Sequence, residues 1–390
     1  MSQARYPDSA VQGRRWLPFV LLTPFQFIFG LIYSWGAIAP AIHRQSGWSE
    51  PTLDLCFSLT PLALMPAVVF AGHALHRTPP KTLLAIALSL FTLGGLLGIA
   101  PGSALPFMAG YSILALGLGA GLSTAACIAM VSRLYPGQRG SLGGALLALY
   151  GMSSTLSAPV FQVLDHRLGW QAALAALVCV YAALGWLAWF GLPATTSSTH
   201  TPKTPRPSLR RMIGHPPLLT ALAIVMAAAP LGSASFATIG QLSPKLGFNT
   251  GFAVIAVSLM AFGNGLGRFG FGVLADLRSA RFSRNAVLTL NLTAAGLLLL
   301  ALEGIAPHLF VIYPLLIGLT FGGMAGKLPS LAAAVARNGH TEAAFGLLFG
   351  TFALASFLGP LITASLGVHT GLTVLTACAL LAVALAVITR

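Results

Sequence analysis

Long apolar runs, each about 20 residues, recur along the whole chain and are separated by short polar segments. A helix of that length spans the hydrocarbon core of a bilayer, whereas the strands of a membrane barrel are shorter and alternate in polarity. Because every backbone polar group in hydrocarbon must be satisfied internally, the pattern predicts a helical bundle. We expect twelve spans, at 16–42, 53–75, 82–100, 105–133, 140–164, 170–192, 217–242, 251–276, 285–302, 308–336, 342–366 and 371–389.

One polar stretch, from Pro193 to Pro217, is longer than the others and is rich in Thr, Ser and Pro. A stretch of this composition cannot form a packed core and is typical of a solvated linker. It divides the chain into an N-terminal six-helix bundle (1–192), a cytoplasmic linker (193–216) and a C-terminal six-helix bundle (217–390).

The two halves resemble one another at a nearly constant offset. Gly72-x-x-x-His76-Arg77 after the second span matches Gly272-x-x-x-Asp276-Leu277-Arg278 after the eighth, 200 residues later. Two further pairs, Gly117 with Gly318 and Pro159 with Pro360, lie 201 residues apart. An even repeat of six helices gives both copies the same orientation, as in one large class of transporters. We therefore expect an all-α integral membrane protein with two pseudo-symmetric bundles.

Composition and charge support this interpretation. The chain is 56% hydrophobic and 7% charged, whereas soluble domains carry roughly 25% charged residues. The net charge of +14 does not indicate a nucleic-acid partner, because the cations lie singly or in small groups between apolar runs. With the N-terminus inside, sixteen of the 21 Lys and Arg residues lie on the cytoplasmic side and three lie outside. The positive-inside rule then predicts a multi-pass inner (plasma) membrane protein with both termini cytoplasmic.

Two cations, Arg268 and Lys327, fall inside apolar runs. Counted from the cytoplasmic ends of their helices, they lie about 12 Å and about 15 Å deep at 1.5 Å per residue. Burying each costs at least ~2.5–3.5 kcal/mol, and all seven acidic residues lie at helix ends or in loops. An anionic substrate would supply the missing negative charge. Pairing with backbone carbonyls or snorkelling to the interface is the alternative that the sequence leaves open.

Polar neighbours extend this candidate binding site. Asn264 lies one turn before Arg268 on the same helix face and can bind the same ligand or orient the guanidinium. The planar guanidinium suits a carboxylate better than the ammonium of Lys327 does. Tyr33 and Gln26 in the first span and Tyr313 in the tenth are further candidate substrate contacts.

The repeat and its Gly-x-x-x-Asp-x-Arg segment resemble the major facilitator superfamily over the whole chain. The resemblance implies a gating role for five residues, which are Gly72, Arg77, Gly272, Asp276 and Arg278, and a weakened gating contact at His76, where an Asp is usual. More narrowly, four segments look like the oxalate/formate antiporter and monocarboxylate transporter group: Tyr33-Ser-Trp-Gly36, Trp48, Tyr135-Pro-Gly-Gln-Arg-Gly140 and Asn264-x-x-x-Arg268. In that group, the arginine that matches Arg268 contacts the substrate carboxylate. The chain departs from the group in having Phe352 where oxalate exchangers carry a lysine, and Asn264 where animal monocarboxylate transporters carry an Asp.

We therefore expect a secondary active transporter that moves a small mono- or dicarboxylate by alternating access, either as an exchanger or as a proton symporter. A multidrug or metabolite efflux permease of the same fold is the alternative, and a transporter-like receptor is a third class. No nucleophile–base pair or metal-ligand cluster stands out in the sequence, so neither an enzyme, a cofactor nor a metal is expected. We expect a monomer in the lipid bilayer.

Overall fold

The computed structural model describes residues 16–100, 102–193, 212, 214–336 and 340–388, and the regular structure in these ranges is helical. Most of the predicted linker over 193–216 lies outside the described residues. The same holds for the terminal residues 1–15 and 389–390, so the predicted cytoplasmic termini are not described.

The N-terminal half contains six long helical segments, several of them built from consecutive pieces that continue one another. In chain order the pieces are α1 (Leu17–Phe29), η2 (Gly30–Ser34), α2 (Trp35–Ser46), α3 (Glu50–Ala74), α4 (Pro80–Gly98), α5 (Ala104–Pro106), the π-helical η3 (Phe107–Gly119), α6 (Ala120–Leu134), η4 (Pro136–Gln138), α7 (Arg139–Met152), α8 (Ser154–Leu168) and α9 (Trp170–Gly191).

The C-terminal half repeats this plan with six further segments. They are α11 (Pro216–Lys245), α12 (Thr250–Leu277), α13 (Ala280–Leu302), η5 (Pro307–Val311) leading into α14 (Tyr313–Gly326) and α15 (Leu328–Val335), α16 (Thr341–Leu366) and α17 (Val368–Ile388).

Ten helical segments of the described chain are long and apolar enough to cross a membrane, or eleven if α14 and α15 form one bent span. The remaining long helix is α12, whose 28 residues include Asn264 and Arg268. The predicted all-helical membrane fold is confirmed.

The tenth predicted span is bent because of a proline. Pro329 follows the break at Lys327, where α14 and α15 meet at 42°. Proline has no N–H to donate to the carbonyl four residues earlier, and its ring clashes with that carbonyl. The chain therefore bends at the position of its buried lysine.

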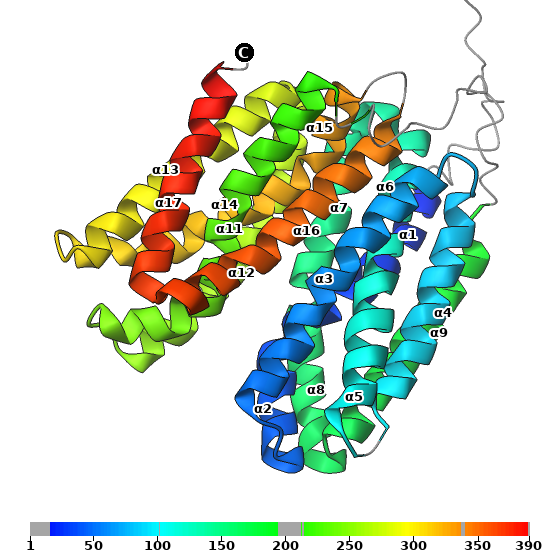
Figure 1. Ribbon diagram of the computed structural model, residues 1–390. Helices are drawn as coiled ribbons and strands as arrows, with labels where there is room; N and C mark the ends of the chain where they lie inside the picture. Colours follow the sequence, from blue (N-terminus) through cyan, green and yellow to red (C-terminus); the bar gives the residue numbers. More distant parts are fainter. Residues whose placement is uncertain (1–15, 101, 194–211, 213, 337–339, 389–390) are drawn as a thin grey trace, which may run out of the picture.

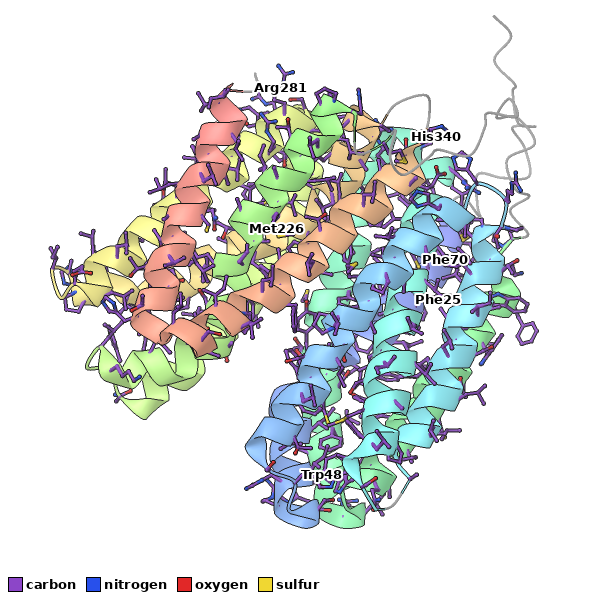
Figure 2. All side chains as sticks on the ribbon, viewed as in Figure 1. Phe25, Trp48, Phe70, Met226, Arg281 and His340 are labelled. Atoms are coloured by element: carbon purple, nitrogen blue, oxygen red, sulfur yellow. The ribbon has the colours of Figure 1, made fainter. Side chains whose placement is uncertain are left out.

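The two halves form two bundles that touch at one end and diverge toward the other (Figure 1). His340 lies at the end where the bundles meet, and Trp48 lies at the opposite end of the N-terminal bundle (Figure 2). We call the end where the bundles meet the Asp276 end, and the opposite end the Trp48 end. The main crossings between the bundles are those of α12 with α7 and of α3 with α16.

Within the C-terminal bundle, α12 packs most closely on α14. A Cβ atom added at Gly318, Gly322 or Gly326 would collide with the backbone of Met260, Asn264 or Arg268, respectively. These positions recur every four residues on each helix, so the two rows face one another along a shared ridge. The glycines let the two backbones touch, which fixes the level at which α12 holds Asn264 and Arg268.

We predict that Gly322→Ala lowers the thermal stability of the purified protein, because its methyl group would push α12 away from α14. Overpacking of this kind costs about 1–3 kcal/mol. Gly270→Ala is the matched control on α12, because nothing lies within 4 Å of an added Cβ there. A denaturation midpoint in detergent that is unchanged or raised by Gly322→Ala would contradict this packing.

Candidate functional site

Arg268 lies between the two bundles, and its guanidinium is held by groups from both of them. On its own helix, Nε donates to Oδ1 of Asn264 at 3.0 Å. Across the interface, Nη1 donates to the carbonyl oxygen of Leu147 at 3.3 Å and Nη2 donates to the hydroxyl of Tyr33 at 3.0 Å. The side chain is 1% exposed. The predicted neighbours Asn264 and Tyr33 are therefore both brought to Arg268.

Two aromatic rings and a glycine complete the surroundings of this guanidinium. Its Cζ lies 6.0 Å from the ring centroid of Tyr33 and 5.8 Å from that of Tyr150. The two rings meet edge to face at 5.6 Å, and such rings attract a cation that lies over their faces. A Cβ at Gly151 would lie 3.3 Å from Nε of Arg268, so α7 makes room for the guanidinium with a glycine.

All these partners are neutral. Four acidic side chains belong to the described part of the chain, and each one lies at or near a helix end: Asp165, Asp276, Glu303 and Glu342. Asp165 forms an ion pair with Arg44 and Glu342 forms one with Arg133, while Oε1 of Glu303 lies 3.8 Å from Nε2 of His369. Of the five N–H donors of a guanidinium, Arg268 uses three in the described contacts. It is therefore hydrogen-bonded without a counter-charge.

Lys327 lies at the same level but in different surroundings. The adjacent Gly326 touches the backbone of Arg268, so the two cations start from neighbouring points on α12 and α14. The side chain of Lys327 is fully buried, and its Nζ has no hydrogen-bond partner among the described residues. It lies within electrostatic reach of Arg284 on α13. The described contacts do not bring its ammonium to the guanidinium of Arg268.

Arg284 corrects one sequence-based expectation. The ninth predicted span begins at 285, so Arg284 directly precedes it and is one of the sixteen basic residues assigned above to the cytoplasmic side. The structure begins α13 at Ala280, because Ser279 caps the helix by accepting from the N–H of Phe282 at 3.0 Å. The early start draws Arg284 into the helix, where it is 9% exposed and donates to Asn285 and to the carbonyl of Ala386. Among its described residues, the C-terminal bundle therefore buries three basic side chains, Arg268, Arg284 and Lys327.

The remaining predicted substrate contacts, Gln26 and Tyr313, are not among the described hydrogen-bond partners of Arg268. Gln26 is fully buried on α1, close to the thiol of Cys127, and neither amide atom has a hydrogen-bond partner among the described residues. Tyr313 lies about 20 Å from Gly326 along the helix, at 1.5 Å per residue. Its hydroxyl is hydrogen-bonded to Ser235 at 2.5 Å and its ring stacks on Phe310. The structure thus joins Tyr313 to the core of the C-terminal bundle and not to the Arg268 site.

The predicted gating residues lie at the Asp276 end. The carboxylate of Asp276 accepts from the backbone N–H groups of Gly140 at 2.9 Å and Ser141 at 2.6 Å. Both amides belong to the first turn of α7, where unsatisfied N–H groups favour a negative charge. Beside them, Gly272 packs directly against Gly140 and Gly144. Asp276 and Gly272 therefore bind α12 to the opposite bundle.

The crossing of α3 with α16 also packs closely at a pair of glycines. A Cβ at Gly72 would lie 3.1 Å from the Cα of Gly346, and His76 contacts His340, which precedes α16. At His76, where the resemblance implies a weakened gating contact, the structure has a direct contact between the two imidazole side chains. Arg77 and Arg278 are both exposed, and the guanidinium of Arg278 lies over the ring of Phe282.

Sequence reasoning missed Tyr150 and Arg284 as members of these clusters. Tyr150 lies in a run of Leu, Ala and Gly, where one aromatic residue looks like ordinary packing. Tyr150 follows Gly144, which packs against α12. The value of this position becomes clear only once it is known that α7 and α12 cross. Arg284 could have been found from Ser279, which has the residue type and position of a helix N-cap.

Comparison with known proteins agrees with this architecture. The sequence over residues 20–389 matches the Major Facilitator Superfamily. No curated protein matches the chain. Among solved structures, a variant of the fucose–proton symporter of E. coli is similar with a TM-score of 0.73 and 16% identity, covering 96% of this chain and 99% of the other.

Two further solved structures are similar over nearly the same share of the chain. A bacterial homologue of the iron transporter ferroportin has a TM-score of 0.75 and 15% identity, covering 96% of this chain and 100% of its own. A proton–xylose symporter has a TM-score of 0.67 and 13% identity, covering 95% and 94%. At these identities the likeness concerns the fold. The sequence match over nearly the whole chain shows that this multi-pass membrane protein belongs to the Major Facilitator Superfamily and is a transporter rather than an enzyme.

Proposed function

We propose that this protein moves a small organic anion across the membrane by alternating access, with Arg268 as the anchor for a carboxylate. The observation that carries the proposal is the burial of the Arg268 guanidinium among neutral partners from both bundles. A carboxylate is a stronger acceptor for a guanidinium than a hydroxyl or a backbone carbonyl, since both oxygens bind and the charge is compensated. It would therefore displace the bonds to Tyr33 and Leu147.

This exchange of partners connects binding to movement. The bonds from Arg268 to Tyr33 and Leu147 tie α12 to the N-terminal bundle. An anion that replaces them changes how strongly the bundles hold together at the depth of the site. A ligand shifts a conformational equilibrium by its difference in affinity for the two states. Binding of the carboxylate would thus shift the equilibrium between the conformations of the transporter.

Lys327 bears on the size of the substrate. Its ammonium is buried without a hydrogen-bond acceptor among the described residues, but it does not share the partners of Arg268. A monocarboxylate needs Arg268 alone. A dicarboxylate would need Lys327 to turn toward the interface. Substitution of Arg268 and of Lys327 should therefore distinguish a monocarboxylate substrate from a dicarboxylate substrate.

We further propose that the Asp276 end faces the cytoplasm of the cell and that the carrier is an exchanger or a proton symporter of the inner (plasma) membrane. The orientation follows from the excess of Lys and Arg at that end of the predicted spans. Efflux of lipophilic cations ranks lower, because the four described acidic side chains lie at helix ends and not at the depth of Arg268.

We predict that a thermal-shift screen of the purified protein against mono- and dicarboxylates identifies a stabilising anion, and that Arg268→Ala abolishes the shift. A ligand at a hundred times its Kd stabilises the folded state by ~2.7 kcal/mol, which such a screen resolves. Arg268→Lys should bind only weakly, because the ammonium cannot bind a carboxylate bidentately.

The matched control is Arg281→Ala, which removes one exposed cation near the Asp276 end and should leave the shift unchanged (Figure 2). Lys327→Met should reduce a dicarboxylate shift while sparing a monocarboxylate shift. A carboxylate that stabilises Arg268→Ala as strongly as the wild type would refute the proposed anchor.

We predict that uptake of the radiolabelled anion into proteoliposomes is strongly accelerated either by the same anion inside or by an imposed inward proton gradient. An empty carrier returns with an uncompensated buried cation, at a cost of ~2.5–3.5 kcal/mol, or about a hundredfold in rate. Acceleration by internal anion indicates exchange, and acceleration by the gradient indicates symport. Equal uptake under all conditions would exclude both mechanisms.

A further inference from the structure

The two crossings that hold the bundles together at the Asp276 end are equivalent by the internal repeat but differ in chemistry. At one crossing, the carboxylate of Asp276 binds the first-turn amides of α7. At the other, the repeat sets His76 at the position equivalent to Asp276 and α16 at the position equivalent to α7. Carboxylates keep their charge over the range in which histidine titrates. Among the described residues of the two crossings, the histidines of the second are the groups that change charge near neutral pH.

The histidine contact depends on the protonation state. Nε2 of His76 lies 2.7 Å from Nδ1 of His340, and the ring centroids are 4.7 Å apart. At this distance one nitrogen donates a proton and the other accepts it, so at least one ring is neutral. When both rings are charged, all four nitrogens carry protons. The two facing N–H groups then repel one another and the bond is lost.

The surroundings offer little compensation for a second positive charge. The one described carboxylate nearby, that of Glu342 on α16, already accepts from Nε of Arg133 on α6 at 3.2 Å. Arg133 also donates to the carbonyl of Leu75 at 3.0 Å. The other titratable or charged groups that act on the pair are basic: His73 on α3 and Arg77 in the turn after it. Arg337 precedes His340 in sequence and lies outside the described residues.

Burial and the basic neighbours lower the pKa of both histidines, and Glu342 opposes them. The pKa of His76 is lowered from 6.5 chiefly by burial, against which Glu342 raises it, while His73, Arg133 and Arg77 lower it further. The pKa of His340 is lowered by burial, then by His76, with Glu342 acting against both. A base whose pKa is lower in the closed contact than in the separated rings binds fewer protons when closed. The contact is therefore stable above the ordinary histidine pKa and loses stability as the pH falls below it.

We propose that His76 and His340 form a proton-released latch, so that acidification at the Asp276 end opens the crossing of α3 with α16 while the crossing of α12 with α7 stays closed. The latch is independent of the identity of the substrate. In the orientation proposed above, it makes the cytoplasmic closure of this transporter sensitive to cytoplasmic acid. It also makes the opening asymmetric, because one of the two equivalent crossings would open first.

Hydrogen–deuterium exchange of the full-length protein in lipid nanodiscs tests the latch without any ligand. Exchange is followed by mass spectrometry at about pH 7.5 and about pH 5.5, on either side of the ordinary histidine pKa, with labelling times scaled for the intrinsic chemical rate. We expect the scaled exchange of segments 70–80 and 340–347 to rise by about threefold or more at the lower pH. Segments 138–145 and 271–279, at the crossing closed by Asp276, serve as the internal control and should not change.

Three variants make the result specific. His340→Gln and His76→Gln each remove one titrating ring and should abolish the rise. His76→Asp copies the chemistry of Asp276 and should keep the crossing closed at the lower pH, because a carboxylate attracts both a protonated His340 and the first-turn amides of α16. An equal rise at both crossings, no rise in the wild type, or a rise that persists in both glutamine variants would overturn the proposal.

Discussion

A buried positive charge without a negative partner is the constraint on which this structure turns. The hydrogen bonds that a charged group makes are worth about 1.5–3 kcal/mol each, and burying the cation costs about 2.5–3.5 kcal/mol or more. Arg268 therefore needs several acceptors at once, and a single helix cannot supply them. Asn264 comes from its own helix, whereas Leu147 and Tyr33 come from the opposite bundle. The Arg268 guanidinium finds this set of acceptors where the two bundles meet.

This requirement explains the distribution of glycines around the site. Gly144 lets α7 approach α12 closely, since a Cβ there would lie 2.6 Å from the backbone oxygen of Arg268. This approach brings the guanidinium to its acceptor on α7, the carbonyl of Leu147. Gly151 leaves room for the charged head in the same way. On the other side of α12, Gly322 and Gly326 bring α14 into backbone contact. Bulkier residues on either side would separate the helices, and Arg268 would lose the acceptors that satisfy it.

Much of the fold could be predicted from the sequence because hydrocarbon permits few alternatives. A continuous apolar run must be a helix when no water can satisfy its backbone, and the offset of the repeat relates the two halves. Pairing across the interface could not be predicted to the same degree. Asn264 was associated with Arg268 through its spacing of one helical turn, and Tyr33 was named a candidate through its residue type and the family resemblance; both contact Arg268. Tyr313 has the same residue type, yet its position along α14 joins it to Ser235.

The misplacement of Arg284 has a related cause. Hydropathy sets the start of a span at the first apolar residue, but a helix starts where its first amides find an acceptor. Ser279 provides one, and the polar first turns of α13 then carry Arg284 inward, within electrostatic reach of Lys327. A count of flanking charges still predicts orientation, since it depends on the side of the membrane and not on depth. It does not predict which of those charges is buried.

The internal repeat also shows what symmetry leaves free. Gly72 and Gly272 keep equivalent roles, because each sets a close crossing with a helix of the other bundle and any side chain there would force the bundles apart. The residue four positions later is not constrained by close backbone packing in this way. Its side chain needs only to bind the start of the facing helix, and a carboxylate and an imidazole can both do so. Packing thus holds the two crossings alike, while the chemistry that closes them is free to diverge, as Asp276 and His76 have done.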